Sequence, residues 1–266
     1  MSKITVSSLK KIKQADEKFV CLTVYDAIYA QVLESAGVDV LLVGDSLGMV
    51  IQGHDTTLPV TVDDIIYHTK AVRRGSQEAL IMADMPFMSY VDEGNALANA
   101  GRIMKEGGAH IVKLEGGAAF THIIEQLALH GIPVCGHLGL LPQSVNKLGG
   151  YKVQGKDRQS AETILHDAKL LEQAGCDIML LECVPLELAK QVTESLQIPV
   201  IGIGAGPHCD GQVLVLQDML GITPGKRPRF THDFLADTGN IAAAVEAYVK
   251  AVKSGEFPSP QQSFTS

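Results

Sequence analysis

Four carboxylates stand at the ends of apolar runs in this sequence, where buried strands are expected to stop. The runs VLLV, LIMA, IVKL and IMLL lead to Asp45, Asp84, Glu115 and Glu182 respectively. An ionised carboxylate held out of water is costly unless something compensates its charge. Four acids in equivalent positions therefore predict a shared polar site and not a solvent-exposed surface.

The chemistry that best suits such a cluster is the binding of a hard divalent cation. Carboxylates that share a pocket repel one another, and Mg²⁺ typically takes one or two of them together with substrate oxygens and water. We predict that Asp45 and Asp84 are metal ligands and that Glu115 binds directly or through water. Capping of a helix or pairing with Lys or Arg is an alternative that stays open for each acid taken singly.

Three further polar residues accompany the acids. Lys113 lies two residues before Glu115, so both side chains are expected on one face of the same strand. Among the nine histidines, His137 is the one at a strand end, where a buried, satisfied histidine is an alternative to a functional one. Ser46 follows Asp45 directly, which places it either to contact a substrate or simply to turn the chain.

Other site chemistries have weaker support in the residue types. Cys183 follows Glu182, but no neighbouring cationic residue is evident to lower its pKa, which disfavours a cysteine nucleophile. No pair of histidines has the spacing of zinc ligands, so zinc is disfavoured. The stretch GIGAG at 202–206 is a weak signal for an anion-binding loop.

The elements that must position these residues are eight short apolar strands, most of them separated by amphipathic helices. The strands are expected at 19–24, 38–44, 79–83, 110–114, 133–136, 177–181, 199–203 and 212–216. Apolar runs of this kind are typical of a parallel sheet covered by helices. A unit of glycine, apolar strand and terminal acid recurs about every 70 residues. This period predicts an α/β fold, a (β/α)₈ TIM barrel, whose strand C-termini open onto one face.

Length and composition fit one globular unit. The chain has 266 residues, 46% of them hydrophobic and 20% charged. We expect a single barrel domain over 1–266 with a short N-terminal extension and a frayed tail at 258–266. A net charge of −8 argues against nucleic acid as a partner. No apolar run approaches the roughly 20 residues that a membrane span requires. Five cysteines without a CxxC pair and an N-terminus without a signal core predict a cytoplasmic protein.

Six blocks of this sequence resemble the ketopantoate hydroxymethyltransferase family. They are VGDSLGMVIQGHDTTLPVT, ADMPFMSY, GGAHIVKLEGG, GIPVCGHLGLLPQSVNKLGGYKVQGK, LLECVP and IGIGAGPHCDGQVLVLQDMLG, and the resemblance runs from about residue 4 to residue 253. It implies a barrel of the phosphoenolpyruvate/pyruvate superfamily. It also implies transfer of a hydroxymethyl group from 5,10-methylenetetrahydrofolate to 3-methyl-2-oxobutanoate, which gives 2-dehydropantoate in the first committed step of pantothenate synthesis. Members of the family usually assemble as decamers, so the resemblance implies a homo-oligomer.

The resemblance implies a role for each polar residue at the strand ends. The matches are Asp45, Asp84 and Glu115 to the Mg²⁺ site, Asp45, Ser46, Asp84, Lys113 and His137 to the 2-oxo acid site, and Glu182 to the proton acceptor. The physical chemistry agrees, because a 2-oxo acid can chelate Mg²⁺ and the cation stabilises the enolate that forms on proton loss from C3. Glu182, on a strand across the barrel mouth, is expected to be the base that takes this proton.

Two alternatives remain open at the level of sequence. A Mg²⁺-dependent lyase or mutase acting on a 2-oxo acid or phosphoenolpyruvate shares the superfamily, but the lyases resembling 2-methylisocitrate lyase typically carry a KKCGH-like loop, which this sequence lacks. A non-catalytic barrel that binds a 2-oxo acid would leave Glu182 without a function.

Overall fold

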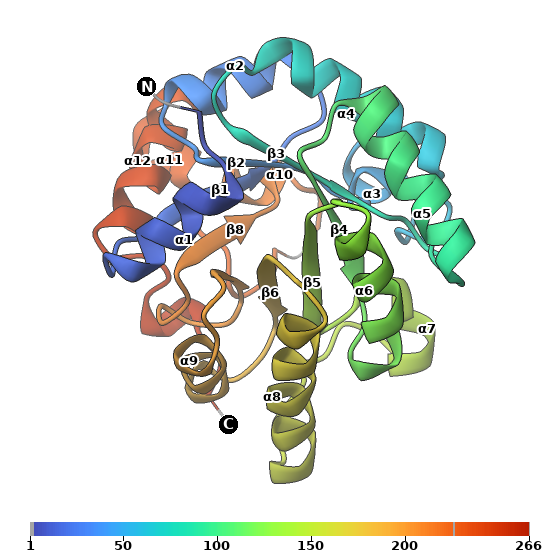
Figure 1. Ribbon diagram of the computed structural model, residues 1–266. Coiled ribbons are helices and arrows are strands. Elements are labelled where there is room, and N and C mark those ends of the chain that lie inside the picture. The colour runs from blue at the N-terminus through green and yellow to red at the C-terminus, as the bar shows by residue number, and fades with distance from the viewer. Residues whose placement is uncertain (1–2, 226, 266) are drawn as a thin grey trace.

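The computed structural model describes residues 3–225 and 227–265, and its strands close into a parallel barrel (Figure 1). The strands are β1 Phe19–Thr23, β2 Val40–Val43, β3 Leu80–Asp84, β4 Ile111–Glu115, β5 Val134–Gly139, β6 Ile178–Glu182, β7 Val200–Ile203 and β8 Gly211–Leu214. Neighbours pair in sequence order, and β8 pairs with β1 to complete the ring. This confirms the predicted (β/α)₈ TIM barrel.

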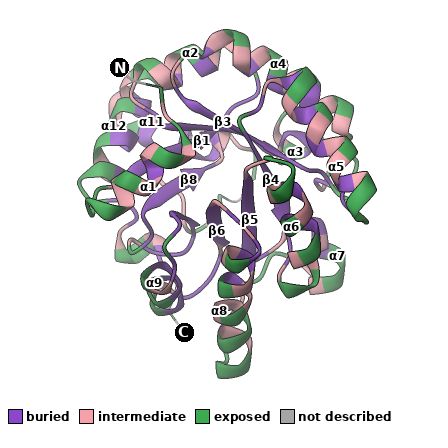
Figure 2. Ribbon diagram, viewed as in Figure 1, coloured by how far each residue is buried: buried purple, intermediate pink, exposed green. Residues whose placement is uncertain are grey.

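Helices surround the barrel and cover the outer face of the strands. The long ones are α2 Ala27–Ser35, α4 Val62–Gly75, α5 Glu93–Arg102, α6 Thr121–Leu129, α8 Arg158–Gln173, α9 Leu186–Ser195 and α12 Ile241–Lys253. Figure 2 shows strands that are buried along their length and helices whose outer faces are exposed, as amphipathic helices packed on an apolar barrel require. Within the described residues, no helix is both long and apolar enough to cross a bilayer.

Short elements fill the connections at the barrel ends. They are the helices α3 Leu47–Val50, α7 Val145–Leu148, α10 Leu216–Met219 and α11 Phe234–Thr238, the π-helical turn Ile103–Gly107, and the 3₁₀ turns Ala118–Phe120, Pro142–Ser144 and Pro260–Gln262. Two of them, α3 and α7, lie in the long connections that follow β2 and β5. These connections carry residues of the candidate site described below.

Helix α1 (Val6–Gln14) lies against the N-terminal end of the barrel. Lys10 Nζ lies 3.5 Å from Asp177 Oδ1, and Lys13 Nζ lies 2.8 Å from Asp210 Oδ2. Both acids directly precede a strand, Asp177 before β6 and Asp210 before β8. Since α1 occupies this end, the C-terminal end is the one left for a site.

The C-terminal segment differs from the frayed tail that we expected. Leu186 N donates a hydrogen bond to Phe264 O at 2.9 Å, and Ser263 is only 1% exposed. The Phe264 ring makes an edge contact with Phe230, with centroids 6.4 Å apart, and Arg229 lies over its face. Packing of the Phe264 ring thus holds 258–265 on the barrel, although the polar composition of this segment predicts a free tail.

Gly75, the last residue of α4, allows this helix to pack closely on α2. A Cβ atom at Gly75 would overlap the carbonyl oxygen of Ala27 at the start of α2. We expect Gly75→Ala to lower the free energy of unfolding by about 1–3 kcal/mol, the usual cost of overpacking. Gly101→Ala in α5, where a Cβ would meet nothing within 4 Å, is the matched control and should not destabilise. Urea unfolding of both variants measures this, and equal stabilities would contradict the prediction.

Candidate active site

The acids predicted from the sequence come together at the C-terminal ends of the strands. Asp84, Glu115 and Glu182 are the last residues of β3, β4 and β6, and Asp45 lies two residues beyond β2. Asp45 and Asp84 are in direct contact, since the Asp45 backbone N–H donates to Asp84 Oδ2 at 2.9 Å. The barrel therefore gathers four carboxylates from four strands at one mouth.

A series of charged contacts runs from Asp84 to Glu182. Lys113 Nζ lies 3.0 Å from Asp84 Oδ1 and 3.5 Å from His137 Nδ1. His137 Nδ1 lies 3.5 Å from Glu115 Oε1, and His137 Nε2 lies 3.2 Å from Glu182 Oε2. The Glu182 side chain is 15% exposed, whereas the other four side chains are at most 5% exposed. Glu182 is thus the member of this series that solvent or a bound molecule can reach most easily.

The electrostatics of the cluster reflect an excess of negative charge. Burial, followed by repulsion from Asp84 and Glu115, raises the pKa of Asp45 well above its ordinary value, against the opposing charge of Lys113. Burial acts to lower the pKa of Lys113, but attraction to Asp84, Glu115 and Asp45 outweighs it and the pKa is raised. Lys113 is therefore a fixed cation, and one positive charge does not balance three neighbouring acids.

His137 is held between two carboxylates. Burial and the charge of Lys113 act to lower the pKa of His137, but its contacts with the Glu115 and Glu182 carboxylates outweigh them, and the pKa is raised above its ordinary value. His137 is a residue of β5 and lies opposite Glu115 of β4 in the strand register. His137 is thus buried, which is one of the two possibilities that the sequence left open, and it also contacts Glu182, the most accessible acid.

The donor atoms suit a hard cation, although the side chains do not enclose one in their present positions. Among residues 3–225 and 227–265, no three His, Cys, Asp or Glu side chains are placed to hold a metal ion together. Yet Glu115 Oε1 is buried without a hydrogen bond, and Asp84 Oδ1 has only its ion pair with Lys113. Buried carboxylate oxygens with unused lone pairs are the ligands that Mg²⁺ prefers. The residues present therefore fit a divalent cation in the type of their donor atoms.

The raised pKa of Asp45 predicts a pH-dependent stability of the metal-free protein. The folded state binds the Asp45 proton more tightly than the unfolded state, so the free energy of unfolding falls as pH rises from about 4, the unfolded-state pKa, toward the higher folded-state pKa. We expect Asp45→Asn to raise the Tm in EDTA at about pH 7.5 by about 2–4 °C, which corresponds to roughly 1 kcal/mol.

Calorimetry between about pH 4.5 and pH 8 measures this effect. The advantage of Asp45→Asn should shrink as the pH approaches about 4, because the wild-type carboxyl is then protonated in both states. Added Mg²⁺ should stabilise the wild type and not the variant. A variant with a lower Tm than the wild type at neutral pH would contradict the sign of this prediction.

Sequence reasoning missed Gln143, Tyr90 and Tyr25. Gln143 Nε2 donates to Asp45 Oδ2 at 2.8 Å, and Tyr90 Oη donates to Gln143 Oε1 at 2.6 Å. The hydroxyls of Tyr25 and Ser46 lie 2.8 Å apart, and the Ser46 side chain does not cap α3. Gln143 lies in an irregular connection that lacks hydrophobic periodicity, so its sequence carried no signal for a partner.

The surroundings of Cys183 disfavour a nucleophile, and those of the GIGAG turn at 202–206 disfavour an anion site. Cys183 is 5% exposed, and burial followed by the charge of Glu182 raises the pKa of its thiol, which opposes a role as nucleophile. All five cysteines are buried and free. In the GIGAG turn, Gly204 has a φ of 59°, and the rings of Phe230 and Phe264 lie against it. Apolar rings there do not form an anion site.

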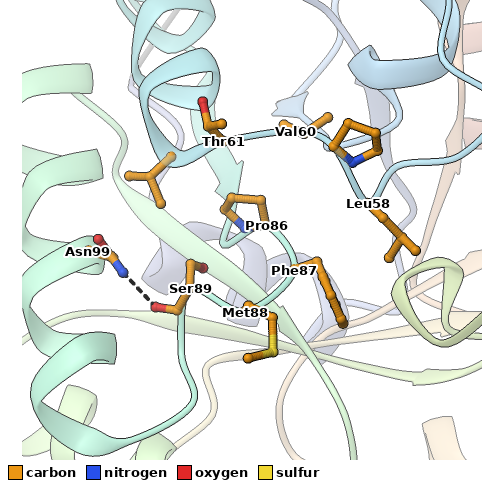
Figure 3. Close-up of a pocket in the computed structure, with 10 residues that line it drawn as sticks. Leu58, Val60, Thr61, Pro86, Phe87, Met88, Ser89 and Asn99 are labelled. Atoms are coloured by element: carbon orange, nitrogen blue, oxygen red, sulfur yellow. Dashed lines mark hydrogen bonds between the residues drawn. The ribbon is translucent and has the colours of Figure 1, made fainter.

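Two cavities are present in the described part of the chain, and one of them adjoins the acid cluster. The first, of about 330 Å³, lies between 58–62 and 86–89, and Figure 3 shows Asn99 donating to Ser89 O at its edge, at 2.8 Å. None of the predicted site residues lines it. The second, of about 320 Å³, is lined by aromatic and apolar residues together with Glu115 and Gln143. It adjoins the cluster and offers space for a ligand larger than a small acid.

Comparisons with known proteins agree on one family. The profile of the ketopantoate hydroxymethyltransferase family matches residues 3–260. The 3-methyl-2-oxobutanoate hydroxymethyltransferase of Nitrosococcus oceani is 58% identical over 258 residues, which cover 97% of this chain and 98% of that protein.

Solved structures of low sequence identity share the fold. The 2,3-dimethylmalate lyase structure, a member of the PEP mutase/isocitrate lyase superfamily, aligns with a TM-score of 0.59 at 18% identity, over 98% of this chain and 93% of that one. Phosphonopyruvate hydrolase in complex with oxalate and Mg²⁺ aligns with a TM-score of 0.61 at 12% identity, with the same coverage of 98% and 93%.

Proposed function

This chain belongs to the ketopantoate hydroxymethyltransferase family, and from that premise we propose how its site works. It is a transferase, a 3-methyl-2-oxobutanoate hydroxymethyltransferase, which places it at the first step of pantothenate synthesis. We propose that the donor is 5,10-methylenetetrahydrofolate and the product 2-dehydropantoate. The observation that carries the proposal is the strand-end cluster, in which buried acids and a buried lysine face one more accessible acid.

We infer that the buried part of the cluster binds the 2-oxo acid. Asp45, Asp84 and Glu115 would hold Mg²⁺, which when bound supplies Lewis acidity to the substrate oxygens. Lys113, a buried cation, attracts the carboxylate of the substrate and the charge that develops beside it. Ser46, held by Tyr25, can donate to a substrate oxygen. Support comes from the similarly folded phosphonopyruvate hydrolase, which was solved with Mg²⁺ and oxalate, a small dicarboxylate.

Glu182 is the proposed base. Its side chain is the most accessible of the four acids, and its Oε2 lies 3.2 Å from His137 Nε2. This contact holds the carboxylate in one orientation, so that the other oxygen is available to accept the C3 proton of the 2-oxo acid. The carbon that loses the proton then forms a C–C bond to the one-carbon unit of the folate; both C–N bonds of that unit break, water supplies the hydroxyl group, and tetrahydrofolate leaves. The second cavity provides adjoining space for the folate.

The experiment that tests this function needs no folate in its first stage. The protein is mixed with 3-methyl-2-oxobutanoate and Mg²⁺ in D₂O, and the C3 proton is followed by NMR. We expect metal-dependent loss of that signal, abolished by EDTA, and formation of 2-dehydropantoate once methylenetetrahydrofolate is added. A non-catalytic barrel would bind the acid without exchange. Neither exchange nor product in the presence of the folate would overturn the proposal.

Assembly and location are also part of the proposal. Phe87, Met88 and Val91 are large apolar side chains of one connection, after β3, with 44–62% exposure, and contiguous exposed apolar side chains often mark an interaction surface. A homo-oligomer, a decamer by resemblance to the family, would cover such side chains, and light scattering after gel filtration measures its mass. Five free, buried cysteines support a cytoplasmic location, since a reducing compartment keeps thiols unpaired.

A further inference from the structure

Gln143 is a buried glutamine whose amide is fully used at the acid cluster. It is 6% exposed and lies in the 3₁₀ turn Pro142–Ser144 after β5. Its Nε2 donates to Asp45 Oδ2 at 2.8 Å and to Met85 O at 3.0 Å, and its Oε1 accepts from Tyr90 Oη at 2.6 Å. Both amide hydrogens and the carbonyl oxygen thus have partners.

Gln143 also holds the second acid of the cluster. Its backbone N–H donates to Glu115 Oε2 at 3.0 Å, while Glu115 Oε1 remains buried without a hydrogen bond. One residue therefore occupies one oxygen of Asp45 and one oxygen of Glu115. A carboxylate fixed by a hydrogen bond at one oxygen presents the other in a defined direction, as partners of metal ligands commonly arrange.

We propose that Gln143 is a positioning residue for the metal site, and that the Tyr90 hydroxyl holds its amide in place. The proposal rests on the metal role proposed above for Asp45 and Glu115. It adds that these acids, which lie 70 residues apart in the chain, are aligned by a single residue from a third segment.

The acceptors around the amide decide which end faces Asp45. Asp45 Oδ2 and Met85 O both accept from Nε2, and the Tyr90 hydroxyl donates to Gln143 Oε1 on the other side. A reversed amide would set Oε1 against Asp45 Oδ2, two acceptors without a proton between them. The Tyr90 ring is itself fixed by an edge contact with Phe120, with centroids 5.5 Å apart. Burial and the charge of Glu115 raise the pKa of Tyr90, so its hydroxyl keeps its proton.

The test uses Mn²⁺ as a spectroscopic probe of the cation site, titrated by EPR with and without 3-methyl-2-oxobutanoate. Gln143→Met keeps the length of the side chain and removes its side-chain hydrogen bonds to Asp45, Met85 and Tyr90, while the backbone N–H bond to Glu115 remains. We expect Mn²⁺ affinity to fall about 10- to 100-fold, the usual effect of losing a residue that orients metal ligands. The KM for the 2-oxo acid and the rate of C3 proton exchange should worsen with it.

Gln212→Met is the matched control for burial. Gln212 is 3% exposed, and its Nε2 donates to a backbone carbonyl, Gly206 O, at 3.0 Å and not to an acid of the cluster. We expect this variant to lose thermal stability to a similar degree and to keep wild-type Mn²⁺ affinity. Equal Mn²⁺ affinity of wild type and Gln143→Met, or an equal loss in both Gln→Met variants, would overturn the positioning role.

Tyr90→Phe is a second test that does not depend on Gln143→Met folding: it should weaken Mn²⁺ binding by about threefold, and unchanged affinity would contradict the role of Tyr90. Where Gln143→Met folds, Tyr90→Phe should have little further effect in that background, because it acts through Gln143. Independent, additive effects of the two substitutions would contradict that order of action. A wild type that neither binds Mn²⁺ nor exchanges the C3 proton would instead overturn the proposed function, and this inference with it.

Discussion

Glu182→Gln is expected to lower the rate of C3 proton exchange, and with it kcat, by roughly 10²–10⁴-fold, the range for loss of a general base. The amide has nearly the shape of the carboxylate, so its contact with His137 can persist through the amide oxygen while the ability to accept a proton is lost. Binding of Mg²⁺ and the 2-oxo acid should change little, because the proposed ligands are other residues. NMR in D₂O gives the exchange rate, and calorimetric titration gives the affinity.

The control for this variant is Glu187→Gln. Glu187 lies in the first turn of α9 and is exposed, so the same change of charge there should leave exchange and transfer unchanged. Wild-type exchange by Glu182→Gln would remove Glu182 from the base role. Loss of substrate affinity together with exchange would instead indicate that Glu182 helps to bind the acid.

Asp84→Asn should have the largest effect on cation binding. The amide oxygen can still accept from the Asp45 backbone N–H, so the local backbone should be kept, but the negative charge facing Lys113 and the cation is lost. We expect Mg²⁺ or Mn²⁺ affinity to fall roughly 100-fold, since about 3 kcal/mol is typical for truncating a buried charge pair. Affinity for the 2-oxo acid should fall in parallel, because the proposal makes its binding depend on the cation.

Asp84→Asn also tests the buried ion pair. Lys113 and Asp84 are each at most 5% exposed, so removing one charge leaves the other without its nearest partner and should lower the Tm. Asp63→Asn is the matched control, because Asp63 pairs with Arg102 at 2.7 Å but its side chain is 79% exposed. An exposed pair contributes at most about 1 kcal/mol. Unchanged cation affinity in Asp84→Asn would refute its assignment as a ligand.

The sequence by itself determined the barrel and the types of residue at its mouth. Most strands are largely apolar runs, and β2 (Val40–Val43) lies within the stretch 38–44 where a strand is expected. Hydrophobic burial depends on local composition, so the runs and the acids that end them could be recognised without knowing their neighbours. The convergence of Asp45, Asp84, Glu115 and Glu182 then followed from parallel closure, which brings all strand C-termini to one face.

Strand ends were harder to predict where a glycine continues the sheet. We expected the fifth strand to stop at Gly136, but β5 extends to Gly139 and includes His137. Gly139 has a φ of 93°, and a Cβ atom there would overlap the carbonyl oxygen of Glu182 on β6. A glycine usually signals a turn in a sequence, whereas here it permits close approach of two strands, a requirement that only the neighbouring strand imposes.

Only the tertiary structure decided which polar atoms meet. Gln143 binds Asp45 across 98 residues of sequence, and Lys113 pairs with Asp84 and not with Glu115, its neighbour on β4. The same holds for Phe264, which anchors the C-terminal segment on α9 through Leu186. A side chain's type is fixed by the sequence, but its partner depends on strand register and on the conformation of irregular connections. Those are set by the packing of the whole barrel, because no local pattern of residues specifies them.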